Sequence, residues 1–140
     1  MKALLKAVRT TLRGDVTLNA LVTGGIYTNS TSQSATLPYL VWNHAGQYRT
    51  DVNTGQPQIE VHIIRFRTFA TSIVTTADAL ERVEKIFFTT PLPTMDTGTV
   101  MQILREGTMI ELDPDMTTHG EEVWVSTLQL AVMIQRNPIA

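Results

Sequence analysis

TSIVTTADALERVEKIFF, residues 71–88, is the most strongly helical segment of the chain. Its apolar side chains recur with the period of an α-helix and form one stripe, made of Ile73, Ala77, Leu80, Val83 and Phe87. Two charge pairs lie outside the stripe at the i,i+4 spacing that favours ion pairing, Asp78 with Arg82 and Glu81 with Lys85. The pattern therefore predicts one long amphipathic helix with a single face to bury.

Strand patterns lie on both sides of this helix. Segments with strand-like alternation or extended character are residues 39–44, 59–67, 100–112 and 123–136. Gly107 interrupts the third of them and predicts a bulge or a turn. Between the first two, residues 45–58 contain Gly46, Gly55 and Pro57, and we expect a long connection there.

The N-terminal part of the chain predicts two short helices and a strand. Residues 2–13 place apolar side chains at helical spacing, at Leu4, Leu5, Val8 and Leu12. Asp15 is placed to cap a second helix, and Gly24 with Gly25 is placed to end it, because glycine adopts left-handed conformations readily. A strand is then expected near Ile26 and Tyr27.

The order helix, strands, helix, strands predicts an α+β fold. We expect a largely antiparallel sheet covered on one face by a short N-terminal helix and one long central helix. Threonine occupies 22 of 140 positions, and this β-branched residue favours strands over helical bundles. The length corresponds to about one domain, and no linker or repeat divides it, so residues 1–140 are expected to form a single domain.

Composition excludes several classes of protein. A chain with 43% hydrophobic and 17% charged residues has enough apolar surface to fold, so it is not intrinsically disordered. The longest apolar run, residues 128–134, is too short to cross a bilayer, and Lys6 interrupts the stretch that a signal peptide would need. We therefore expect no membrane partner and no export. Cysteine is absent, which removes thiolate catalysis, cysteine-bound zinc and iron–sulfur clusters.

No catalytic or metal-binding constellation is found. Histidines occur only at positions 44, 62 and 119, and no two of them have the spacing of metal ligands on one element. Residues 113–121 resemble a calcium loop at first, but Thr118 stands where glycine is needed and Trp124 where glutamate is needed. There is no G-x-S-x-G nucleophile motif either. We expect no enzyme activity, no cofactor and no bound metal.

Charge is divided unevenly along the chain, although the net charge is only −2. The small negative net charge argues against a dedicated nucleic-acid binder. One side of the first helix carries a basic stripe, and an acidic segment lies near the last turn. These two clusters are our candidates for subunit contacts: Lys2, Lys6, Arg9 and Arg13 on the basic side, and Glu111, Asp113, Asp115, Glu121 and Glu122 on the acidic side. The same distribution of charge would also arise if both clusters simply faced solvent and made no subunit contact.

The order of these signals resembles the tail-completion, or tail-terminator, proteins of long-tailed bacteriophages. The pieces that carry the resemblance are Gly25-Ile26-Tyr27 after the helix pair, a polar loop, and Leu37-Pro38-Tyr39 at the start of a strand. A long helix and two strands flanking an acidic turn follow, so the similarity extends over nearly the whole chain.

The resemblance implies a structural virion protein at the junction of tail and head, assembled in the host cytoplasm. Such a protein forms a hexameric ring, caps the tail tube, ends its growth and joins the tail to the DNA-filled head. Its partners would be further copies of itself, a tail-tube protein and a head-completion or connector protein, with DNA only passing through the ring. Two alternatives stay open: another phage neck, connector or tail-tube component, and a non-viral α+β domain that binds a small ligand.

Overall fold

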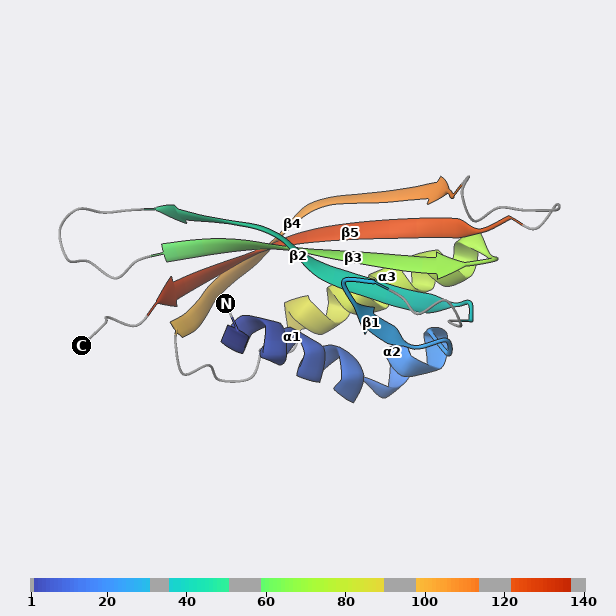
Figure 1. Ribbon diagram of the computed structural model, residues 1–140, viewed down its shortest axis with the longest axis horizontal. Coiled ribbons are helices and arrows are strands. Elements are labelled where there is room, and N and C mark those ends of the chain that lie inside the picture. Colours follow the sequence, from blue (N-terminus) through green and yellow to red (C-terminus); the bar gives the residue numbers. More distant parts are fainter. Residues whose placement is uncertain (1, 31–35, 51–58, 90–97, 114–121, 137–140) are drawn as a thin grey trace.

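The computed structural model describes residues 2–30, 36–50, 59–89, 98–113 and 122–136. It contains three helices and five strands (Figure 1). The helices are α1 (Lys2–Gly14), α2 (Val16–Leu21) and α3 (Ile73–Thr89). The strands are β1 (Ile26–Thr28), β2 (Tyr39–Thr50), β3 (Ile59–Ala70), β4 (Gly98–Leu112) and β5 (Trp124–Arg136).

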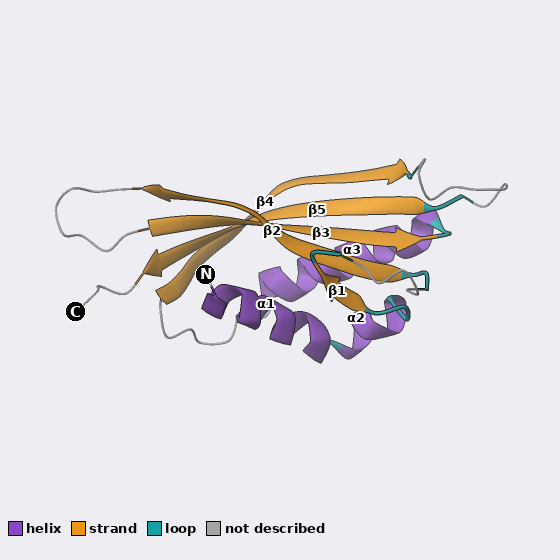
Figure 2. Cartoon of the chain, viewed as in Figure 1, coloured by secondary structure: helices purple, strands orange, loops and turns teal. Residues whose placement is uncertain are grey.

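The strands form one sheet in the order β1-β2-β3-β5-β4. All neighbours are antiparallel except β1 and β2, which run parallel. The sheet is strongly twisted, and the helices lie together on one of its sides (Figure 2). This arrangement confirms the α+β fold with a largely antiparallel sheet. In the described part of the chain, no helix is long and apolar enough to cross a membrane.

The main core lies between the helices and the sheet. It takes apolar residues from every layer, namely Leu4, Val8 and Leu12 of α1, Leu80, Val83 and Phe87 of α3, and Trp42, Phe66, Leu128 and Leu130 of the sheet. Phe66 and Phe87 meet with their ring centroids 5.3 Å apart. Leu80, Val83 and Phe87 of the predicted stripe are buried in this core, whereas Ile73 is exposed and Ala77 is half-buried. The buried face of the helix is completed by Thr76, Ala79 and Ile86.

β2 is longer than the strand that we predicted over residues 39–44. The long connection that we expected over residues 45–58 is therefore wrong in its first part. β2 continues to Thr50, with a register shift between His44 and Gly46. Pairing with β3 satisfies the backbone of Gly46 and Gln47, so the strand passes through a glycine that would otherwise favour a turn. The rest of the expected connection, residues 51–58, lies outside the described residues.

β4 is an edge strand with two irregularities. Its pairing with β5 shifts between Val100 and Gln102 and again between Arg105 and Gly107, so the bulge predicted at Gly107 is confirmed. Most of the strand is exposed, because it follows the outer border of the sheet and α3 covers only part of its inner face.

Candidate subunit interface

The predicted basic stripe lies on the exposed side of α1. Lys2, Lys6, Arg9 and Arg13 are all exposed, whereas the opposite side of the helix is buried in the core. The i,i+3 and i,i+4 spacing of a helix places the four cations along one line. They form a continuous positive surface, which we call the basic stripe.

The predicted acidic residues have different environments. Glu111, near the end of β4, and Glu122, before β5, are exposed. Asp113 is half-buried, and its backbone N–H donates to the carbonyl of Val123 at 2.8 Å. Asp115 and Glu121 lie outside the described residues.

The two charged surfaces are on opposite borders of the subunit. In Figure 1, α1 and α2 follow the lower border, and the C-terminal half of β4 follows the upper border. The fold therefore does not bring the basic stripe and Glu111 together within one chain. A head-to-tail ring needs two unlike, complementary surfaces on each subunit, and opposite borders satisfy that geometry.

The ion pairs of α3 differ from our prediction. Arg82 does not pair with Asp78 but reaches Asp15 across the helix layer, with Nε–Oδ1 and Nη2–Oδ2 distances of 3.0 Å and 2.7 Å. Asp15 also accepts from the backbone N–H of Leu18 at 2.7 Å, which confirms its role as the cap of α2. The hydrogen bond from Arg82 is the main reason why the pKa of Asp15 lies below its usual value. The pair therefore ties α2 to α3.

A cluster of titratable residues was missed at the sequence level. His44 Nε2 lies 2.9 Å from His62 Nδ1, and His62 Nε2 lies 3.1 Å from Glu60 Oε2. Glu60 and His62 are only 5% and 1% exposed. Two signals could have found it: Glu60 and His62 alternate onto one face of β3, and His44 is on the strand that pairs with it.

This cluster is structural in character. Both ring nitrogens of His62 are already engaged, one by His44 and one by Glu60, so His62 has no atom left for a substrate. Burial lowers the pKa of His62, although Glu60 opposes that effect. Burial, and then the nearby His62, lower the pKa of His44 as well. Both imidazoles are therefore held neutral at neutral pH.

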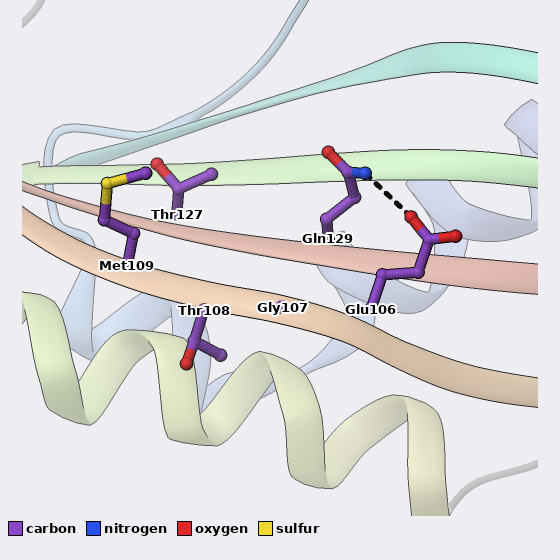
Figure 3. A pocket seen from close by; sticks show the side chains of 6 residues that line it. All are labelled: Glu106, Gly107, Thr108, Met109, Thr127 and Gln129. Atoms are coloured by element: carbon purple, nitrogen blue, oxygen red, sulfur yellow. Dashed lines mark hydrogen bonds between the residues drawn. The ribbon is translucent and has the colours of Figure 1, made fainter.

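A shallow depression of about 470 Å³ lies beside β4 and β5 (Figure 3), lined by Glu106, Gly107, Thr108, Met109, Thr127 and Gln129. Gln129 Nε2 donates to Glu106 Oε2 at 2.7 Å, and Arg65 donates to Gln129 Oε1 at 3.2 Å. These hydrogen bonds link Glu106 of β4, Gln129 of β5 and Arg65 of β3. Among the described residues, no group of three or more His, Asp or Glu could hold a metal ion.

No family model and no curated protein matches this chain in sequence. Solved structures do match it over almost its whole length. A chain in the virion of the native gene transfer agent particle superposes with a TM-score of 0.74 at 16% identity, covering 96% of each chain. The gp17 protein of bacteriophage SPP1 superposes with a TM-score of 0.58 at 19% identity, covering 99% of this chain and 93% of its own.

These identities are too low to carry more than the fold. The coverage shows that the match includes the helices and the sheet together rather than one shared motif. The resemblance inferred from the sequence is thereby confirmed as a structural one: this chain has the fold of proteins found in a bacteriophage and in a gene transfer agent virion.

Proposed function

We propose that the chain is a non-enzymatic structural protein of a phage virion that assembles into a hexameric ring. The ring caps the finished tail tube, ends tail elongation and joins the tail to the DNA-filled head. The observation that carries this proposal is the superposition on a virion protein over 96% of both chains. The partners are further copies of the chain, the tail tube and the head connector, met at the tail–head junction.

The geometry of the subunit supports a ring. The basic stripe belongs to α1 and Glu111 to the end of β4, and these two elements lie on opposite borders (Figure 1), which suits a heterologous interface. The histidine cluster and the Gln129–Glu106 pair beside β4 are held by hydrogen bonds between protein groups, which supports a structural role.

A phage neck, connector or tail-tube component is the second candidate, because the matching chain belongs to a whole virion. A tube protein would polymerise into long tubes, whereas a terminator stops at single rings. Light scattering of the purified protein, followed by electron microscopy, separates the two.

Loss of the protein from its phage is expected to leave heads and tails unjoined, with many tails longer than normal. The reason is that no ring would cap the growing tube or present a docking surface to the head. Electron microscopy of lysates from a deletion phage, with and without a complementing copy, measures both effects. Tails of normal length that still join heads would contradict the proposal.

Isolated rings are expected to bind duplex DNA weakly at physiological salt. Genome passing through the lumen must not be held by its phosphates, and the chain has a net charge of −2. Fluorescence anisotropy with a labelled duplex, repeated over a range of salt concentrations, tests this expectation. Tight binding with a steep salt dependence would contradict a lumen built for transit.

Reversal of charge on the basic stripe is expected to weaken ring formation at low salt. Each exposed ion pair contributes only about 0–1 kcal/mol, so the effect is collective. We expect Lys6→Glu with Arg9→Glu to shift the concentration at which rings form, and Glu111→Lys with Glu122→Lys to restore part of it. Analytical ultracentrifugation at low and high salt measures both shifts.

The reversed variant must remain a folded monomer, which circular dichroism checks. Unchanged assembly, with no salt dependence and no rescue, would show that the two charged surfaces simply face water.

A further inference from the structure

Apolar side chains are exposed among the described residues where the start of α3 lies near the end of β4. Ile73, the first residue of α3, is 45% exposed although its helical spacing from Thr76 and Leu80 puts it on the buried face. On β4, Ile110 and Leu112 are 41% and 39% exposed. We call these three residues the distal apolar patch.

The register shows that the three residues lie on one side of the sheet. Ile110 pairs with Ser126, and the Ser126 hydroxyl donates to the Thr76 carbonyl of α3 at 3.0 Å. Ile110 therefore stands beside the first turns of α3. Leu112 lies two residues further along the same face of β4. Ile73 lies one helical turn before Thr76, at the start of α3.

Contiguous exposed apolar side chains mark interaction surfaces, and an edge strand has backbone groups open to a partner. Within the described part of the chain, no strand pairs with the outer side of β4. The patch also has a charged neighbour, since Glu111 lies between Ile110 and Leu112 and projects to the other face of the strand.

The opposite border carries a surface of matching composition. Val16, the first residue of α2, is 84% exposed and lies three residues after Arg13, the last cation of the basic stripe. One border thus offers an exposed apolar side chain next to cations, and the other offers apolar side chains next to a carboxylate. This is complementarity in charge and in hydrophobicity between two surfaces of the same molecule.

We propose that the distal apolar patch is the docking site for the α1–α2 side of a second copy of this chain. Val16 of that copy packs against Ile110 and Leu112, and its basic stripe faces Glu111. Each subunit uses both borders once, so the contact is heterologous and repeats around a ring. The inference rests on the proposed ring and names the surfaces that build it.

Cysteine cross-linking tests the contact directly, because the natural chain contains no cysteine. The variant carrying both Val16→Cys and Ile110→Cys is oxidised as purified rings and then analysed on a non-reducing gel. We expect a ladder of covalent oligomers, which disappears on reduction. Within one subunit the two positions belong to elements on opposite borders, so the ladder reports contacts between copies.

The matched control pairs Val16→Cys with Phe88→Cys. Phe88 is 48% exposed, a fraction similar to the 41% of Ile110, but it lies near the C-terminal end of α3. We expect no ladder from this control. Cross-linking of Val16→Cys alone, or of Ile110→Cys alone, would indicate a two-fold contact and would overturn the proposal.

A second variant measures the apolar contribution. Ile110→Asp is expected to weaken ring formation by about tenfold or more, because a central apolar contact is replaced by a charge. Phe88→Asp is expected to leave ring formation unchanged. Circular dichroism of both variants is the control that checks whether they fold.

The outcomes separate this proposal from the ring itself. Rings that form without the Val16–Ile110 cross-link, and that tolerate Ile110→Asp, would overturn the docking site and leave the proposed function intact. A chain that forms neither rings nor cross-links, alone or on tail tubes, would overturn both.

Discussion

Gly24→Ala is expected to destabilise the fold by roughly 3 kcal/mol or more, the largest effect of any single substitution considered for this chain. A Cβ atom on Gly24 would clash with the carbonyl oxygen of Thr36 and would lie 2.7 Å from that of Pro38. Both are backbone atoms, so no side chain can move aside. The same glycine donates its N–H to the Pro38 carbonyl at 2.7 Å.

The clash would separate the turn after α2 from the segment that leads into β2. The pairing of β1 with β2 starts there, with the Leu40 N–H donating to the Gly25 carbonyl at 3.0 Å. Thermal unfolding followed by circular dichroism should show a lower midpoint, by about 10 °C for a domain of this size.

Gly14→Ala is the control for Gly24→Ala. No atom lies within 4 Å of a Cβ at Gly14, which ends α1, so this variant is expected to be neutral or slightly more stable. A Gly24→Ala protein as stable as the natural one would show that the chain does not pass so close to Gly24.

Acid is expected to destabilise the protein between pH 7.5 and 5.5 through the buried histidine cluster. His44 and His62 both have a pKa below 6.5 in the folded chain, so the unfolded chain binds protons more readily. The contribution of the two histidines to the free energy of unfolding is therefore complete well above pH 6.5, and it is lost as the pH falls through 6.5 toward their folded pKa values. The window lies above the pH at which exposed carboxylates titrate.

Two substitutions assign this pH dependence to the cluster. His62→Leu removes the central imidazole, so stability should be lower at pH 7.5, by about 1–3 kcal/mol, and should change less with pH. Glu60→Gln keeps a polar partner but removes the negative charge that favours protonated His62, so the loss below pH 6.5 should become steeper.

The measurement is the midpoint of thermal or urea unfolding at half-unit pH steps. Equal stability of the natural chain at pH 7.5 and 5.5 would contradict the prediction. A His62→Leu profile with the same slope as the natural chain would assign the pH dependence to other groups.

Much of the fold could be predicted because its determinants are local. The stripe of α3 depends on residues three and four positions apart, the cap at Asp15 on a residue three positions ahead, and the bulge near Gly107 on one glycine. Alternation on β3 and β5 is equally local. From such signals the α+β class and its order of elements followed.

Contacts between distant parts of the chain could not be predicted in the same way. The partner of Arg82 is Asp15, 67 residues away, rather than the nearby Asp78. The length of β2 depends on its pairing with β3, which supplies backbone partners that no local pattern reveals. The histidine cluster arises from the same pairing.

For the candidate interface, the sequence by itself determined which residues carry charge and that the four cations share one side of a helix. Only the tertiary structure decided that the basic stripe and the end of β4 lie on opposite borders, and that Val16, Ile110 and Leu112 are left exposed beside them. The physical reason is that a residue's spacing determines which face of its own element it occupies. Whether that face is covered depends on elements distant in the chain.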